Sequence, residues 1–219
     1  MKKLPESSRQ VLIGRADQLN QLNQYIQEIY KSEPRIWLIQ GEAGIGKTHL
    51  LKEIQSVAVT HGLQVYKGRC IEDLALPYLP FMESLFPHLE QSCDDAEALY
   101  EDDLAMIRHL RRGRPVSTPA TPEQVQQDKL RLFLSVSRAT ISLAQQSPAL
   151  LMLDDLHWAD QPSLDLFAYL AFALADQGSA PLLILGTHRP IEPEHPLARL
   201  INRFERESIY RSVILPGRV

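Results

Sequence analysis

The chain has 219 residues, 44% of them hydrophobic, with 23 basic and 27 acidic side chains and a net charge of −4. Such a composition is typical of a globular domain and demands neither nucleic acid nor an anionic membrane as a partner. Two cysteines, Cys70 and Cys93, are too few for a disulfide framework or a zinc knuckle. No apolar run reaches membrane-spanning length and none follows the lysines of MKKLPESSRQ, so we expect a cytoplasmic protein without a signal peptide.

The N-terminal part predicts an arm, a helix and a strand. Residues 1–10 are polar, and we expect them to form a flexible arm. From Ala16 onward, apolar residues recur with a helical period until Pro34 interrupts the pattern. The short apolar run RIWLIQ at 35–40 then predicts a buried strand, because it is followed directly by glycine.

The next segment repeats the alternation of helix and strand. The stretch that starts at Lys47 predicts a helix ending at Gly62, and the alternating pattern at 63–69 predicts a second strand. Residues 71–120 are less regular, with several prolines, although 94–111 have the apolar spacing of a helix. An Arg/Pro/Thr-rich linker follows it.

The second half begins with a clear helix start. Thr121, Pro122 and Gln124 supply an N-cap, a proline at the first helical position and a capping-box partner, and the helix is expected to end near Gln146. The remaining predicted elements are a strand at 149–154, a helix at 162–178, a strand at 181–187, a helix at 196–205 and a strand at 208–216. Strands that alternate with helices indicate an α/β fold, a mainly parallel sheet with helices on both faces.

The sequence GEAGIGKT fits the phosphate-binding pattern G-x-x-x-x-G-K-[ST] at Gly41, Gly46, Lys47 and Thr48. Glycines allow the backbone to curl so that amide groups point at phosphate oxygens, and the following helix adds its positive N-terminal end. Lys47 would contact the β- and γ-phosphates, and the Thr48 hydroxyl would bind Mg²⁺. The predicted nucleotide-binding segment is Gly41, Glu42, Ala43, Gly44, Ile45, Gly46, Lys47, Thr48 and His49.

Two acids follow the strand at 149–154. Asp154 ends the strand and should lie at the carboxyl edge of the sheet, beside the glycine loop, where we expect it to bind Mg²⁺ through water. Asp155 is then placed to orient the water that attacks the γ-phosphate. An Asp-Asp pair by itself is more typical of a solvated turn, and only its combination with a phosphate-binding loop favours the functional interpretation. A carboxylate next to a metal ligand can also serve only to order its loop.

A third element, ILGTHR, is an apolar strand that ends in Thr187 and Arg189. Both side chains should lie at the same edge of the sheet as the two acids. Arg189 could contact the γ-phosphate and report its presence. The alternative is an ordinary surface arginine after a strand.

Six segments now occur in one order: LIGRADQL, GEAGIGKTHLL, GRC, PYLP, LLMLDDLHWAD and LLILGTHR. Together they resemble the nucleotide-binding domain of AAA+-like STAND ATPases, the signal-transduction ATPases with numerous domains. Domains of this kind occur in large LuxR-type regulators and in cyclase- and kinase-linked bacterial sensors, and related ones are described as origin-recognition-like AAA ATPases. The resemblance covers about residues 11–215.

This resemblance implies a P-loop NTPase fold with a five-stranded parallel sheet in the order 5-1-4-3-2. It also implies that Ile13, Gly14 and Arg15 pack near the adenine and ribose, although Ala16 stands where a glutamate is usual. In the family the second acid of the pair is linked to hydrolysis, and the threonine and arginine after the fourth strand act as a sensor. Asp155, Thr187 and Arg189 match those positions.

Several other residues match family signatures whose chemistry the sequence does not explain. His157, Trp158 and Asp160 belong to the DDLHWAD segment, and Tyr78 and Pro80 belong to PYLP. We expect His157 to order its loop through hydrogen bonds rather than to act as a catalyst. Trp158, Tyr78 and Pro80 are expected to pack in the core.

The domain organisation is predicted as one P-loop NTPase core at 11–219 after the arm. Proteins of the family continue into a helical lid, a winged-helix domain and an effector domain, whereas this chain ends at Val219, just after its predicted fifth strand. We therefore expect either a fragment or a stand-alone core that lacks the lid and effector domains. Such a core would bind nucleotide more weakly and would hydrolyse it slowly.

The predicted function is a regulatory ATPase that binds ATP or ADP with Mg²⁺ and acts as a nucleotide switch on an attached or separate protein partner. One alternative is an interaction module that keeps nucleotide for stability without hydrolysing it. Another is an AAA ATPase that acts on nucleic acid, for which the only support is the basic run Arg108, Arg111, Arg112 and Arg114. A small-molecule phosphotransferase would use the same loop, but no motif for binding an acceptor is visible. Neither nucleic acid nor a membrane is expected as a partner of this chain alone.

Overall fold

The computed structural model describes Asn20, Ile26 and residues 35–74, 76–91, 121–177 and 180–215. Asn20 and Ile26 are both helical, in agreement with the periodic pattern after Ala16. The predicted helix at 94–111, the basic linker and Cys93 lie outside the described residues.

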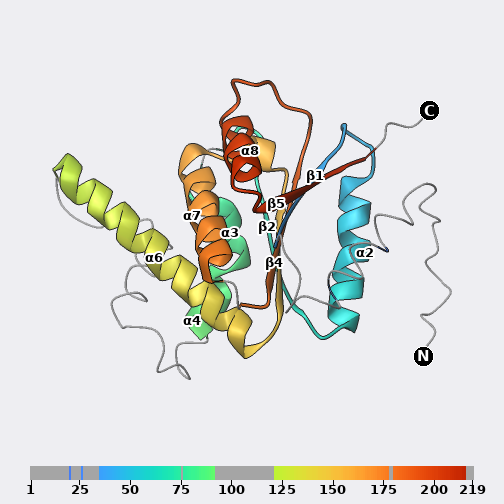
Figure 1. Ribbon diagram of the computed structural model, residues 1–219, viewed down its shortest axis with the longest axis horizontal. Coiled ribbons are helices and arrows are strands. Elements are labelled where there is room, and N and C mark those ends of the chain that lie inside the picture. Colours follow the sequence, from blue (N-terminus) through green and yellow to red (C-terminus); the bar gives the residue numbers. More distant parts are fainter. Residues whose placement is uncertain are drawn as a thin grey trace.

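Within the described residues, five parallel strands form one sheet in the order β2-β3-β4-β1-β5, which confirms the predicted order 5-1-4-3-2 read from the opposite edge (Figure 1). The central strands β3, β4 and β1 are apolar runs of five to seven residues, because a sheet covered on both faces buries the side chains of its central strands. The edge strands β2 and β5 are more polar and partly exposed. The bounds are β1 Ile36–Gln40, β2 Gln64–Arg69, β3 Ala149–Asp154, β4 Leu182–His188 and β5 Tyr210–Ile214.

Helices cover both faces of this sheet, with α2 on one side and α3, α4, α6, α7 and α8 on the opposite side (Figure 1). Two short helices occupy part of the proline-rich segment that the sequence described only as irregular. None of the helices in the described part of the chain combines the length and the apolar run needed to cross a bilayer. The bounds are α2 Lys47–Thr60, α3 Leu79–Ser84, α4 Phe86–Gln91, α6 Pro122–Gln146, α7 Gln161–Gln177 and α8 Pro196–Arg206, with a 3-10 turn, η3, at Leu156–Trp158.

The start of α6 confirms the capping signal in the sequence. The Thr121 hydroxyl accepts a hydrogen bond from the backbone N–H of Gln124, and the Gln124 side chain accepts one from the backbone N–H of Thr121. This reciprocal pair satisfies two amides that the first helical turn leaves without partners, and so it sets where the helix begins.

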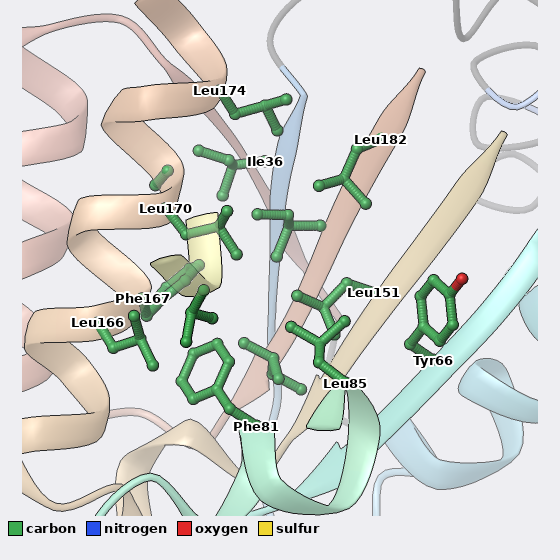
Figure 2. Packing of buried hydrophobic residues seen from close by; sticks show 14 of the residues in the cluster. Ile36, Tyr66, Phe81, Leu85, Leu151, Leu166, Phe167, Leu170, Leu174 and Leu182 are labelled. Carbon is green, nitrogen blue, oxygen red and sulfur yellow. The ribbon is translucent and has the colours of Figure 1, made fainter. Parts of the chain in front are cut away.

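The sheet separates two apolar cores. Because successive strand side chains point to opposite faces, Ile36 and Leu38 of β1 pack in the larger core, while Trp37 and Ile39 pack in the smaller one beneath α2. Figure 2 shows the larger core, where side chains from α3 and α7 meet those of the strands. Its labelled members are Ile36, Tyr66, Phe81, Leu85, Leu151, Leu166, Phe167, Leu170, Leu174 and Leu182.

One glycine fixes the distance between β2 and α3. A Cβ atom built on Gly68 would collide with the backbone carbonyl of Pro80, at the second residue of α3. The obstacle is main chain of a buried helix, so it cannot rotate away as a flexible side chain would. Gly68 therefore allows the PYLP segment to pack directly on the edge strand.

We predict that Gly68→Ala lowers the free energy of unfolding by about 3 kcal/mol, because α3 must move away from β2. The matched control is Lys67→Ala at the neighbouring exposed position, which should change the unfolding free energy by less than about 0.5 kcal/mol. Urea denaturation of both variants measures the difference. Equal midpoints for Gly68→Ala and wild type would contradict the close contact.

Candidate functional site

The carboxyl ends of the parallel strands meet at one edge of the sheet, and the predicted site residues that the structure describes lie there. Pairing aligns Ile39 of β1 with Thr187 of β4, and Leu153 of β3 with Gly186 of β4. Asp154 is the last residue of β3. The glycine loop starts directly after β1, so strand register alone brings these segments together.

The glycine loop has the backbone conformation that its sequence predicts. Gly44 and Gly46 have φ angles of 71° and 95°, in the left-handed region that favours glycine. Gly46 is the N-cap of α2, and nothing lies within 4 Å of a Cβ placed on Gly44. The amide of Gly41 donates to the carbonyl of His188 (3.1 Å), which ties the loop to the end of β4.

The ammonium group of Lys47 is held inside this loop. Its Nζ donates to the carbonyl oxygens of Gly41 (2.7 Å) and Glu42 (3.0 Å), and only 7% of the residue is exposed. Burial lowers the pKa of Lys47, and the positive charge of Arg189 acts in the same direction, while Asp155 and Asp154 oppose the shift. These four charged side chains therefore share one electrostatic environment.

The start of α2 is open to a bound anion. The first amides of an α-helix have no acceptor within the helix, and they lie at the positive end of the helix dipole. Thr48 in this first turn is exposed and His49 is half-buried. The left-handed glycines, this helix end and Lys47 fit a polyphosphate, because they present N–H groups and an ammonium without a competing side chain at Gly44.

Asp154 and Asp155 are linked through Thr187. The Thr187 hydroxyl donates to Asp154 Oδ1 (2.5 Å) and accepts from the backbone N–H of Asp155 (3.0 Å). Thr187 is fully buried and Asp154 is 4% exposed. The threonine that the sequence suggested as a sensor thus holds the end of β3 against the end of β4.

The Asp155 side chain has a partner that the sequence analysis missed. Asp155 Oδ2 accepts from Arg69 Nη2 (3.2 Å) and Nε (3.3 Å), and Asp155 adopts the left-handed conformation with φ 59°. Arg69 is largely exposed, whereas the Asp155 side chain is mostly buried. In the sequence, the GRC segment contains Arg69, but nothing in that segment predicts its partner. The contact becomes predictable only when the strand order is known, because pairing of β2 with β3 aligns Arg69 with Asp154, next to Asp155.

The loop after β3 and the loop after β4 are tied together by His157. Its Nδ1 accepts from the backbone N–H of Arg189 (3.4 Å), and its carbonyl lies 3.1 Å from Nε2 of His195. The guanidinium of Arg189 lies over the Trp158 ring, 5.8 Å from its centre. The expectation that His157 orders its loop is confirmed, and Trp158 packs half-buried against the larger core.

The remaining signature residues have structural partners. The Asp160 carboxylate accepts from the amide of Ser163 (2.8 Å) and from its hydroxyl (2.7 Å), at the start of α7. The same hydroxyl accepts from the backbone N–H of Tyr78 (2.9 Å), which joins the PYLP segment to α7. Pro80 is buried, and the Tyr78 ring packs edge-on against Phe133, as expected for packing residues.

Some predicted residues are not tested by this structure. Ile13, Gly14 and Arg15, assigned to the adenine and ribose, lie outside the described residues, as do the arginines at 108–114. Among the described residues, no group of three or more His, Cys, Asp or Glu side chains could hold a metal ion. Thr48 and Asp154 fit Mg²⁺ only as partial ligands, which is how Mg²⁺ is usually held beside substrate phosphates.

Comparison with known sequences gives a family and one distant relative. A family model described as "AAA ATPase domain" matches residues 11–185. Uncharacterized protein R02095 of Rhizobium meliloti (strain 1021) is 24% identical over 199 residues, which is 82% of this chain. The match covers only 18% of that protein's length.

Comparison with solved structures supports the fold. Cdc6p from Pyrobaculum aerophilum matches with a TM-score of 0.53 and 12% identity, over 97% of this chain and 48% of that chain. The Aeropyrum pernix ORC1 protein in complex with DNA matches with a TM-score of 0.51 and 16% identity, over 99% of this chain and 48% of that chain. Replication initiator DnaA bound to AMPPCP and single-stranded DNA matches with a TM-score of 0.51 and 16% identity, over 94% of this chain and 47% of that chain. The chain spans about half the length of each of these proteins.

We predict that Thr187→Val lowers the free energy of unfolding by about 2–3 kcal/mol, because Asp154 Oδ1 and the Asp155 amide both lose a buried partner. Valine preserves the shape of threonine, so the change tests the hydroxyl. Thr187→Ser keeps the hydroxyl and should cost less than about 1.5 kcal/mol. Thermal and urea unfolding of the two variants measure the effect. A valine variant as stable as the serine variant would show that the bridge contributes nothing.

Proposed function

This chain belongs to the AAA ATPase domain family, and from that premise we propose that it is a slow, Mg²⁺-dependent ATPase whose nucleotide state acts as a regulatory switch. The single observation that carries the proposal is the convergence at one sheet edge of the glycine loop with Lys47, the bridged pair Asp154 and Thr187, and the charges of Asp155 and Arg189. A surface turn with two acids would need neither a buried lysine nor a buried threonine bridge.

The glycine loop and the start of α2 bind the phosphates of ATP in this proposal. Lys47 leaves the carbonyls of Gly41 and Glu42 and contacts the β- and γ-phosphates. Thr48 and Asp154 are the residues that would hold Mg²⁺, which supplies charge neutralisation at the phosphates. The carboxylate of Asp154 is already oriented before a metal ion binds, because its Oδ1 accepts a hydrogen bond from the Thr187 hydroxyl.

Asp155 orients the attacking water. Its carboxylate is the less buried member of the acid pair, and Arg69 holds it in place from β2. Lys47 and Arg189 offset the negative charge that accumulates on the transferred phosphoryl group. Fixed side chains of this kind accelerate hydrolysis because they are oriented before the reaction begins.

Loss of the γ-phosphate changes the contacts of Lys47 and Arg189, and the loop after β4 transmits that change. The resemblance to STAND ATPases favours a signalling or transcriptional output through an attached effector domain or a separate protein partner. The chain spans only part of the length of its relatives, and we propose this output for the whole protein. We place the activity in the cytoplasm, where ATP and Mg²⁺ are available.

Two other functions have specific support. The ion pair between Arg69 and Asp155 occupies the proposed catalytic carboxylate, which favours a module that binds ATP without hydrolysing it. DNA is present with two of the structurally similar proteins, which favours a nucleic-acid-acting ATPase and leaves the expectation against nucleic acid unconfirmed. The net charge of −4 argues for the nucleotide switch. DNA binding that weakens steeply with salt would favour the last alternative.

We expect Lys47→Ala to weaken ATP binding about 100-fold, because the ammonium is the only mobile cation within the glycine loop. Lys52→Ala, which removes an exposed lysine of the same helix, should leave the affinity unchanged. Titration calorimetry with ATP and Mg²⁺ measures both. Failure of the wild-type protein to bind any nucleotide, or equal affinities for wild type and Lys47→Ala, would end the proposal.

Asp155→Asn should reduce the rate of ATP hydrolysis at least about 100-fold while ATP still binds, because the amide cannot polarise the attacking water. Asp176→Asn changes an exposed acid near the end of α7 and serves as the control. Phosphate release is the measurement. If wild type shows no turnover and ATP only raises its melting temperature, the non-hydrolysing module is the correct function.

A further inference from the structure

One buried side chain beside the candidate site has an unused hydrogen-bond donor. His157 is 8% exposed, and its Nδ1 accepts from the backbone N–H of Arg189 (3.4 Å). In a neutral imidazole, an acceptor at Nδ1 places the proton on Nε2. That Nε2 atom is buried and has no hydrogen-bond partner among the residues that the structure describes.

A donor of this kind calls for an explanation, because buried polar atoms in native proteins are nearly always paired. The charged and titratable groups that act on His157 are Asp155, Arg189, Lys47 and His188, so its ring lies within the electrostatic environment of the site. Burial lowers the pKa of His157 to about 4, and the ring is therefore a neutral donor at physiological pH. The hydrogen-bond geometry identifies the Nε2–H of His157 as an unpaired donor. The charged site residues around the ring indicate that its acceptor belongs to a ligand of this site.

We propose that the Nε2–H of His157 donates a hydrogen bond to the terminal phosphate of the bound nucleoside triphosphate, and so distinguishes triphosphate from diphosphate. This inference rests on the proposed function. Phosphate oxygens are strong acceptors, and a neutral imidazole can bind them without adding a further cation beside Lys47 and Arg189. The contact would satisfy the His157 ring nitrogen that has no partner among the described residues.

The contacts of Arg189 link the proposed hydrogen bond of His157 to the loop after β4. The backbone N–H of Arg189 sets the tautomer of His157, while its guanidinium lies over Trp158, whose ring centre is 4.9 Å from that of His157. Because Nε2 has no access to solvent in this conformation, a phosphate reaches it only when neighbouring side chains move. The Arg189 side chain packs on Trp158 beside the His157 ring, so it belongs to the group of side chains that such a movement would involve.

Two substitutions separate the donor from the rest of the ring. In His157→Asn, the amide oxygen replaces Nδ1 as the acceptor for Arg189, but nothing replaces the Nε2 donor. In His157→Gln, the longer side chain places an amide N–H near the position of Nε2. The measurements are the dissociation constants for ATP and ADP, each with Mg²⁺, and the melting temperature of each variant.

We expect His157→Asn to bind ATP about tenfold more weakly and ADP within twofold of wild type, and His157→Gln to retain most of the preference for ATP. A parallel loss of ATP and ADP affinity together with a lower melting temperature would show that His157 only supports the loop, and would overturn the inference. An unchanged ratio of ATP to ADP affinity in His157→Asn would also overturn it. Both results leave the proposed function intact provided that wild-type binding depends on Lys47.

A measurement on the wild-type protein covers the case in which the asparagine variant fails to fold. In the ¹⁵N-labelled protein, the Nε2 resonance of His157 should shift with the ATP analogue AMPPCP and Mg²⁺ but not with ADP and Mg²⁺. The same response to both nucleotides would exclude a contact with the terminal phosphate. Absence of any nucleotide binding would instead refute the proposed function itself.

Discussion

The candidate site depends on one hydroxyl group that joins the ends of two parallel strands. Thr187 donates to the carboxylate of Asp154 and accepts from the amide of Asp155, so a single side chain fixes the last residue of β3 and the first residue after it. Parallel pairing of β1 with β4 brings the glycine loop to the same edge. Without that hydroxyl, the Asp154 carboxylate and the Asp155 amide would each lose a buried hydrogen-bond partner.

Both principal charged groups of the site are occupied by protein partners in this structure. Lys47 contacts the carbonyls of its own loop, and Asp155 contacts Arg69. A polyphosphate would therefore exchange existing contacts for new ones rather than fill an unpaired charge. Exchange between two nearly balanced sets of contacts is a requirement for any switch, because an equilibrium responds only to the difference in affinity between its states.

The similarities to Cdc6p, ORC1 and DnaA concern the arrangement of the polypeptide, at identities of 12% to 16%. One fold supports many functions, so the function of this chain has to be argued from its own side chains. Two such features are the Arg69–Asp155 pair and the imidazole of His157, which links the loops after β3 and β4. Neither follows from the fold, and both involve residues that interact electrostatically with Lys47.

The sequence by itself determined the elements and the chemistry of the loop. Short apolar runs predicted the strands, the capping residues predicted the start of α6, and G-x-x-x-x-G-K-T predicted a phosphate-binding turn before α2, because all three depend on interactions between residues close in the chain. The strand order came from the family resemblance and not from periodicity. Only the tertiary structure paired Arg69 with Asp155 across 86 positions. Only it showed that, in the part of the chain that the structure describes, one nitrogen of His157 has a hydrogen-bond partner and the other has none. These contacts depend on strand register and on the path of two separate loops, which local sequence patterns do not specify.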